Sequence, residues 1–108
     1  MKLGIQFGLL ACSTLLLAAC GGAEGPPEIA AKACNAQAAI QLGGKPFRLD
    51  LAALAATMKD DGGGSRLLTA PVVVDAGLAS ESTQQLECTV RMAEDGSSAA
   101  VLHVRFIW

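Results

Sequence analysis

Residues 84–107 read QQLECTVRMAEDGSSAAVLHVRFI, and this stretch decides the fold because apolar and polar side chains alternate in two runs. An alternation with a period of two places one set of side chains on each face of a β-strand. The turn between the runs contains Asp95-Gly96, a dipeptide that favours a β-hairpin. The stretch therefore predicts two antiparallel strands, over residues 84–92 and 99–107. The side chains expected to face the core are Leu86, Cys88, Val90, Met92, Ala100, Leu102, Val104 and Phe106.

The pairing of these two strands follows from the need to keep the apolar side chains on one face, because a slip of one residue turns every side chain over. The simplest register contains the pairs Val90–Leu102, Cys88–Val104 and Glu87–Arg105. The opposite face carries polar and charged side chains, and we expect it to point away from the helices as a candidate interaction face. Its residues are Glu87, Thr89, Arg91, His103 and Arg105.

A third strand is predicted over residues 66–75, because the run Val72-Val73-Val74 is rich in β-branched side chains. Pro71 has no N–H to donate, so it indicates an edge position or a bulge.

Two helices precede these strands in the sequence. Residues 28–42 follow two prolines, are rich in Ala, Gln and Lys, and end at a Gly-Gly pair. Asp50 is a good N-cap for a second helix that runs to about Lys59, and residues 45–49 form a short extended piece. The apolar stripes are Ile29, Ala33, Ala36 and Ile40 in the first helix, and Leu51, Leu54, Ala55 and Met58 in the second. The predicted class is α+β, with two N-terminal helices packed on one face of a three-stranded antiparallel sheet.

The N-terminal segment has the layout of a signal peptide, with a positive charge at Lys2 and an apolar stretch over residues 3–17. It ends in the tetrapeptide LAAC, whose last residue is Cys20, and this motif resembles the lipobox of bacterial lipoproteins. The resemblance implies cleavage after residue 19 and attachment of diacylglycerol and palmitate to Cys20, which would anchor the protein in a membrane. In Gram-negative lipoproteins an Asp after the lipidated cysteine signals retention in the inner membrane. Gly21 stands there, so we expect the outer membrane, facing the periplasm.

This resemblance gives a three-part organisation: a lipoprotein signal peptide over residues 1–19, a lipidated flexible tether over 20–27, and a small α+β domain over 28–108. An ordinary secretory signal peptide and an uncleaved membrane anchor are the alternatives for the first segment.

Four cysteines can be assigned in turn. Cys12 leaves with the signal peptide and Cys20 carries the lipid, so Cys34 and Cys88 remain in a chain exported to an oxidising compartment. We therefore predict one disulfide between them, with a free redox thiol or two buried thiols as alternatives. Two cysteines and His103 fall short of a closed metal site, so no metal and no cofactor are expected.

The charges and the polar residues exclude several functions. From Cys20 onward the formal charge is −3, so nucleic acid is a poor partner. His103 is the only histidine, and neither a recognisable nucleophile nor an orienting group accompanies it, so we do not expect an enzyme. The remaining hypothesis is a non-enzymatic binding or accessory module, anchored by Cys20, with an envelope protein as a possible partner. The alternative is a periplasmic inhibitor or immunity-type protein that inserts loop 60–65 or loop 76–83 into a partner's cleft.

Overall fold

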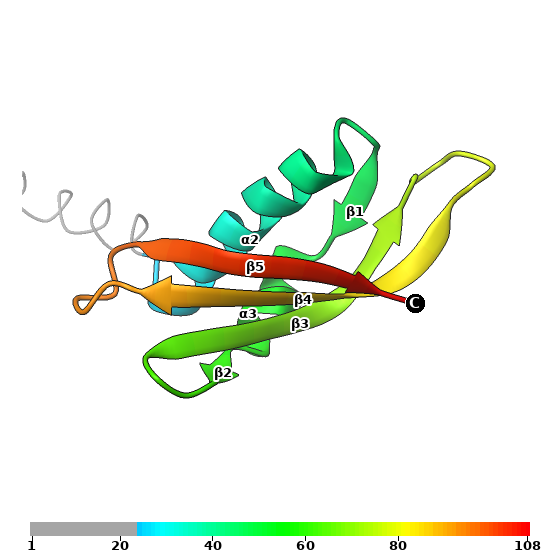
Figure 1. The fold of residues 1–108 in the computed structure, drawn as a ribbon. Helices are drawn as coiled ribbons and strands as arrows, with labels where there is room; N and C mark the ends of the chain where they lie inside the picture. The colour runs from blue at the N-terminus through cyan, green and yellow to red at the C-terminus, as the bar shows by residue number, and fades with distance from the viewer. Residues whose placement is uncertain (1–23) are drawn as a thin grey trace, which may run out of the picture.

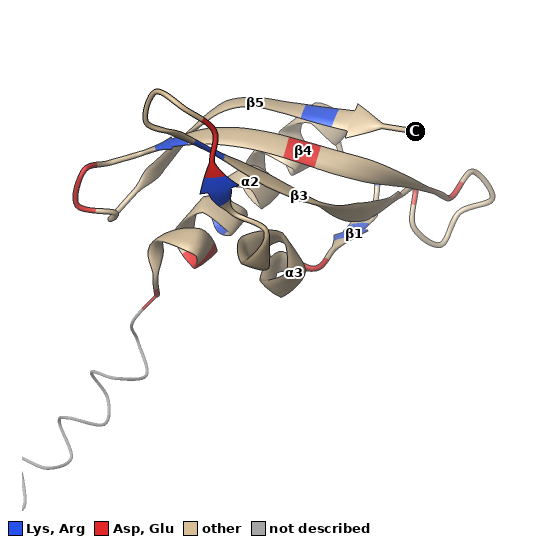
Figure 2. Cartoon of the chain, turned by 90° about the horizontal axis from the view of Figure 1, so that it is seen from below, with Lys and Arg blue, Asp and Glu red and all other residues tan. Residues whose placement is uncertain are grey.

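The structure is a computed structural model that describes residues 24–108 (Figure 1). The predicted signal peptide and Cys20 lie outside the described residues. Five strands form one antiparallel sheet, and two helices lie together on one of its faces (Figure 2). In chain order the elements are α2 (Pro26–Leu42), β1 (Phe47–Leu49), α3 (Leu51–Ala56), β2 (Lys59–Asp60), β3 (Ser65–Val74), β4 (Ser82–Met92) and β5 (Ala99–Ile107).

The α+β class is as predicted, but the sheet has five strands instead of three. The three long strands β3, β4 and β5 are those that the sequence predicts, and they lie side by side in that order. The two additional strands are short, and both pair with the free edge of β3: β2 with its first half and β1 with its second half. Strand β3 is therefore an inner strand, while β5 forms the opposite edge of the sheet.

Pro71 lies where the edge of β3 has no partner strand. Along β3, the pairing with β2 reaches only as far as Leu67 and the pairing with β1 starts at Val72, so Pro71 falls in the gap between them. The missing N–H of proline costs no strand–strand hydrogen bond at such a position. The predicted edge character of Pro71 is therefore a local feature of an inner strand.

Helix α2 begins two residues earlier than predicted, so the predicted tether over 20–27 is too long. Pro26 and Pro27 lie in its first turn, where backbone N–H groups have no acceptor within the helix, so their missing N–H groups cost no hydrogen bond. The Glu28 carboxylate accepts a hydrogen bond from Gly25 N at 3.1 Å. The helix ends at Leu42, and Gly43 follows as its C-cap with a φ of 60°, which glycine adopts easily.

The predicted apolar stripe of α2 is wrong, because Ile40 is 70% exposed. The disulfide explains which stripe is buried: it draws the Cys34 side of the helix against the sheet. Small side chains one turn before and after Cys34 then allow the helix to approach closely. The buried residues of α2 are Ala30, Ala31, Cys34 and Ala38.

Helix α3 begins as predicted and ends early. The Asp50 carboxylate accepts a hydrogen bond from Ala53 N at 3.1 Å, which confirms the N-cap. The helix ends at Ala56, and Lys59 belongs to strand β2 instead of the last helical turn. Leu54 and Ala55 are buried as the predicted stripe requires.

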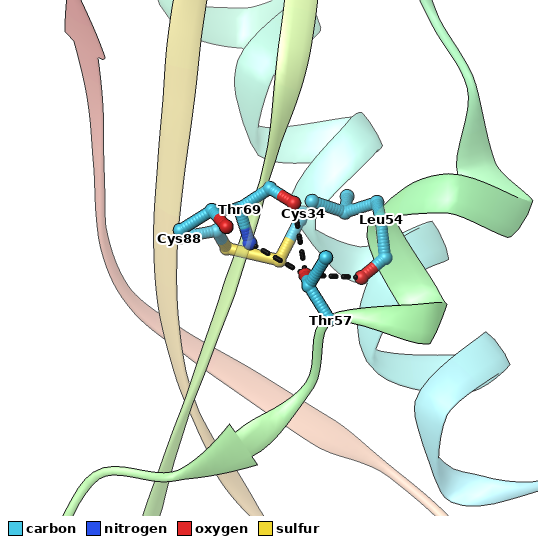
Figure 3. Close-up of a disulfide and its surroundings, with 5 residues drawn as sticks. All are labelled: Cys34, Leu54, Thr57, Thr69 and Cys88. Atoms are coloured by element: carbon cyan, nitrogen blue, oxygen red, sulfur yellow. Dashed lines mark hydrogen bonds between the residues drawn. A yellow bond between two sulfur atoms is a disulfide. The ribbon is translucent and has the colours of Figure 1, made fainter.

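The Thr57 hydroxyl joins the end of α3 to the unpaired edge of β3 (Figure 3). Its oxygen accepts a hydrogen bond from Thr69 N at 2.8 Å, and it lies 2.8 Å from the carbonyl oxygens of both Leu54 and Thr69. One hydroxyl has one hydrogen, so it donates mainly to one of these oxygens at a time. This side chain supplies a partner for β3 where no strand does.

The register between β4 and β5 is as predicted in one half and shifted in the other. Glu87 lies opposite Arg105 and Cys88 opposite Val104, as expected. A bulge between Thr89 and Val90 then changes the register, so that Val90 pairs with Val101 instead of Leu102.

The bulge also changes which side chains of β5 face the core, because one extra residue reverses the alternation beyond it. Ala99 and Val101 pack against the core, whereas Ala100 and Leu102, both predicted to face inward, are exposed. Leu102 is 50% exposed.

The disulfide between Cys34 and Cys88 is present and ties α2 to β4 through the middle of the core (Figure 3). The two Cα atoms are 6.1 Å apart and both side chains are buried. Most of the other buried residues are Ala, Val and Leu, of which the largest fully buried are Leu54, Leu68, Leu86, Val72 and Val90. Within residues 24–108, the helices are too short or too polar to cross a membrane.

Candidate functional site: the exposed sheet face

The face of the sheet that the helices leave uncovered carries all five predicted interface residues. Thr89 lies opposite His103 on this face, and Arg91 lies opposite Ala100. Glu87 lies opposite Arg105, and Arg105 Nη2 donates a hydrogen bond to Glu87 Oε1 at 2.5 Å. We call this surface the outer face; it also includes the side chains of β3, β2 and β1 that share it through cross-strand pairing.

Two further cations lie on the outer face, and neither was among the residues predicted from the sequence. Arg48 in β1 lies opposite Val73, and Lys59 in β2 lies opposite Leu67, which itself lies opposite Thr89. Both strands are too short to show an alternation, so the sequence held no signal for their orientation. Only their pairing with β3 places these side chains beside the predicted residues.

The cations of the outer face are held to different degrees. Arg91 Nη1 donates to the carbonyl oxygen of Gly63 at 2.9 Å, which fixes it against the β2–β3 turn. Arg48 Nη2 lies 3.9 Å from Glu81 Oε1 at the edge of the sheet. In the described part of the chain, Lys59 has no carboxylate within ion-pair distance.

Charge is divided unequally between the outer face and the rest of the domain. The outer face carries the cations Arg48, Lys59, Arg91 and Arg105 and one carboxylate, Glu87. Residues 24–108 outside this face hold three cations and nine carboxylates. Figure 2 shows most of these acidic residues in the loops and along the helical layer. The negative net charge of the sequence therefore conceals a face whose net charge is positive, even when Glu81, which lies beside Arg48 at the edge, is counted with it.

Apolar side chains lie between these charges. Leu67 and Val73 occupy the outer face of β3 and are partly exposed, and Ile107 lies opposite Gln85 at the end of β5. Next to this face, Leu102 at the bulge of β5 is 50% exposed and Trp108, the residue after β5, is 88% exposed. The outer face is therefore amphipathic, with no helix over it (Figure 2).

The residues of the outer face do not form a catalytic constellation. His103 is exposed and lies opposite Thr89, without a carboxylate bonded to it. The two described cysteines are joined to each other, so neither supplies a thiolate. Over residues 24–108, no three His, Cys, Asp or Glu side chains are placed to hold a metal ion. The outer face can form hydrogen bonds and ion pairs with a ligand, and its apolar side chains can be buried by a ligand that covers them.

The two loops named in the sequence analysis are both ordered by internal hydrogen bonds. In the β3–β4 loop, Ser80 Oγ donates to Asp75 Oδ2 at 2.9 Å, and Gly77 N donates to Glu81 Oε1 at 2.7 Å. Leu78 lies in this loop and is 52% exposed. In the β2–β3 loop, Ser65 Oγ donates to the carbonyl oxygen of Gly62 at 2.7 Å.

The β4–β5 turn contains the one described carboxyl with a clearly shifted pKa. The Ser97 hydroxyl donates to Asp95 Oδ1 at 2.7 Å and the Ser97 N–H at 3.0 Å, and these bonds hold the pKa of Asp95 below its ordinary value. The turn lies at the end of the sheet, beside the first turn of α2.

A groove lies on the helical side of the domain. It has a volume of about 540 Å³ and runs between α2 and α3, and most of its lining is apolar. Its walls include Pro27, Ala31, Leu51, Ala55 and Met58.

Comparisons with models of protein families, with curated proteins and with solved structures found no match to this chain.

Proposed function

We propose that this protein is a small lipid-anchored module of the bacterial cell envelope that binds without catalysis through its outer face. The single observation that carries the binding role is the outer face itself: an uncovered sheet surface whose strands carry four cations and one carboxylate. A protein whose net charge is negative has no solubility reason to concentrate its cations on one face.

The lipid anchor rests on the tetrapeptide LAAC at the end of the apolar segment, where Cys20 would receive the acyl chains. Each buried methylene contributes about 0.8 kcal/mol, so several chains on one residue hold a protein stably in a bilayer. The disulfide between Cys34 and Cys88 supports export, because such bonds persist in oxidising compartments. The identity of Gly21 favours the outer membrane over the inner membrane for a Gram-negative source.

Intact-mass analysis of the chain purified from membranes tests the anchor. We expect loss of residues 1–19, gain of a diacylglyceryl group and an acyl chain, and incorporation of labelled palmitate. A Cys20→Ser variant should incorporate no palmitate, while a Cys12→Ser variant, which changes a cysteine inside the predicted signal peptide, should incorporate as much as wild type. A wild-type chain that carries an unmodified Cys20 would contradict the anchor.

An inhibitor or immunity-type protein is the second candidate, and the β3–β4 loop favours it. The loop presents Leu78 to solvent from a backbone ordered by the bonds of Ser80 and Glu81, which suits insertion into an apolar pocket. Cross-linking in the envelope distinguishes the two candidates. A Leu78→Glu change should abolish the cross-link to a partner enzyme if the loop is the contact, whereas an Arg105→Glu change should do so if the outer face is.

A further inference from the structure

We infer that the outer face docks on the anionic lipid headgroups of the membrane that holds the anchor, so that the domain lies flat against the bilayer. This inference rests on the proposed anchor at Cys20 and names what the outer face binds.

Charge complementarity is the first argument. The outer face carries Arg48, Lys59, Arg91 and Arg105 against Glu87 on its strands and Glu81 at its edge beside Arg48, while the rest of the described domain carries the other eight carboxylates and three cations. A body with this separation of charge turns its basic side toward a negative surface and its acidic side away from it. Because an anionic bilayer attracts cations only within about a Debye length, an anchor that keeps the domain close greatly favours this orientation.

The apolar side chains of the outer face are the second argument. Leu67, Val73 and Ile107 lie on the outer face among the cations and are partly exposed, and the exposed Trp108 directly follows Ile107 in the chain. A surface that mixes cations with apolar groups suits the boundary between headgroups and acyl chains, where tryptophan is also favoured. A purely charged face would suit a soluble polyanion equally well, and the exposed apolar groups favour the bilayer.

The reach of the chain before α2 is the third argument. Pro26, the first residue of α2, lies close to Gly96 of the β4–β5 turn at the end of the sheet. A Cβ atom added to Gly96 would lie only 3.0 Å from the Pro26 ring. Residues 20–25 can span up to about 20 Å when extended. This length exceeds the thickness of one layer of the fold, about 10 Å. The lipidated residue can therefore lie at the level of the outer face while α2 stays on the other side of the sheet.

Docking in this orientation has a consequence for the helical side. The helices, their carboxylates and the groove between α2 and α3 would face away from the bilayer. That side would then be the one that soluble envelope components can reach.

The experiment uses the native tryptophan as its probe, because Trp108 is the only one in the chain and follows β5 directly. The full lipidated protein is reconstituted into vesicles of phosphatidylcholine brominated in its acyl chains, either alone or with about one third phosphatidylglycerol. We expect stronger quenching of Trp108 in the vesicles that contain phosphatidylglycerol. The difference should vanish at about 1 M NaCl, where the Debye length is about 3 Å.

Two double variants with the same change in charge provide the comparison. Lys59→Glu with Arg91→Gln removes cations from the outer face, and the ratio of docked to free domain should fall at least about tenfold. Lys45→Glu with Lys32→Gln changes the helical side, and should leave the quenching as in wild type. Thermal melts and far-UV circular dichroism establish that each variant is folded.

The outcomes separate the inference from the function on which it rests. Equal quenching of a lipidated protein in both kinds of vesicle, or equal loss in both double variants, would overturn the docking and leave the anchor standing. Either of these two results would point to an acidic protein as the partner of the outer face. A chain that lacks the diacylglyceryl mass would overturn the anchor, and the membrane docking with it.

Discussion

Removal of the disulfide between Cys34 and Cys88 should take away a large part of the stability of this domain. The bond joins residues separated by 54 positions, so it constrains most of the unfolded chain. The chain-entropy relation gives a loss of about 14 cal/mol/K for a loop of that size, or about 4 kcal/mol at 25 °C. A domain of about 85 residues has a total free energy of unfolding of about 4–13 kcal/mol. The reduced protein should therefore lose between about one third and all of this free energy of unfolding.

Urea denaturation of the exported chain, with and without dithiothreitol, measures this loss without any change of sequence. We expect the midpoint to fall by about 2–4 M, from the loss above and a slope of about 1–2 kcal/mol/M. A double Cys34→Ala and Cys88→Ala variant should lose as much and slightly more, because both side chains are buried and the change leaves small voids. A reduced protein within about 1 kcal/mol of the oxidised one would refute the reasoning, since the long loop would then contribute little.

Three further changes test the packing, the edge of β3 and the β4–β5 turn. Leu86→Ala should cost about 2–5 kcal/mol of unfolding free energy because Leu86 is fully buried. Leu102→Ala should cost less than about 1 kcal/mol because the bulge leaves Leu102 half exposed. Equal costs of the two changes in thermal melts would contradict the shifted register. Thr57→Val should lower the stability by about 1 kcal/mol and speed hydrogen exchange at the Thr69 amide, which loses its acceptor; unchanged exchange would show that the hydroxyl does not protect this edge. Ser97→Ala should raise the pKa of Asp95 toward its ordinary value in an NMR titration, because it removes the hydroxyl hydrogen bond that is the largest cause of the lowered pKa. Since the folded-state pKa is lowered, the contribution of Asp95 to stability is present above the pKa of the unfolded chain and is lost as the pH falls through the folded-state pKa; a pKa that the substitution leaves in place would contradict this assignment.

Features that depend on neighbours in the sequence were predictable. The β4–β5 hairpin follows from alternation and from the Asp95-Gly96 turn, and the start of α3 follows from the capping side chain of Asp50. The disulfide between Cys34 and Cys88 was predictable by elimination, since the expected signal peptide and lipid anchor would leave only these two cysteines.

The stripe of α2 that is buried could not be predicted from hydropathy. Alanines lie on nearly every side of this helix, so several stripes are almost equally apolar, and the more apolar choice would have buried Ile40. The tertiary bond from Cys34 to the sheet decides between them, because a disulfide requires its two Cα atoms within about 7 Å.

The composition of the outer face was also decided by the tertiary structure. The sequence by itself determined which side of β4 is polar, because its side chains alternate without interruption from Leu86 to Met92. Only the fold brings Arg48 and Lys59 to that side, since strands of three and two residues contain no period and take their orientation from β3. The bulge opposite Val90 is likewise a product of pairing, because it lets β5 bury Val101 where strict alternation would bury Leu102. Local patterns fix the direction of a side chain within its own strand, and long-range pairing fixes which side chains meet.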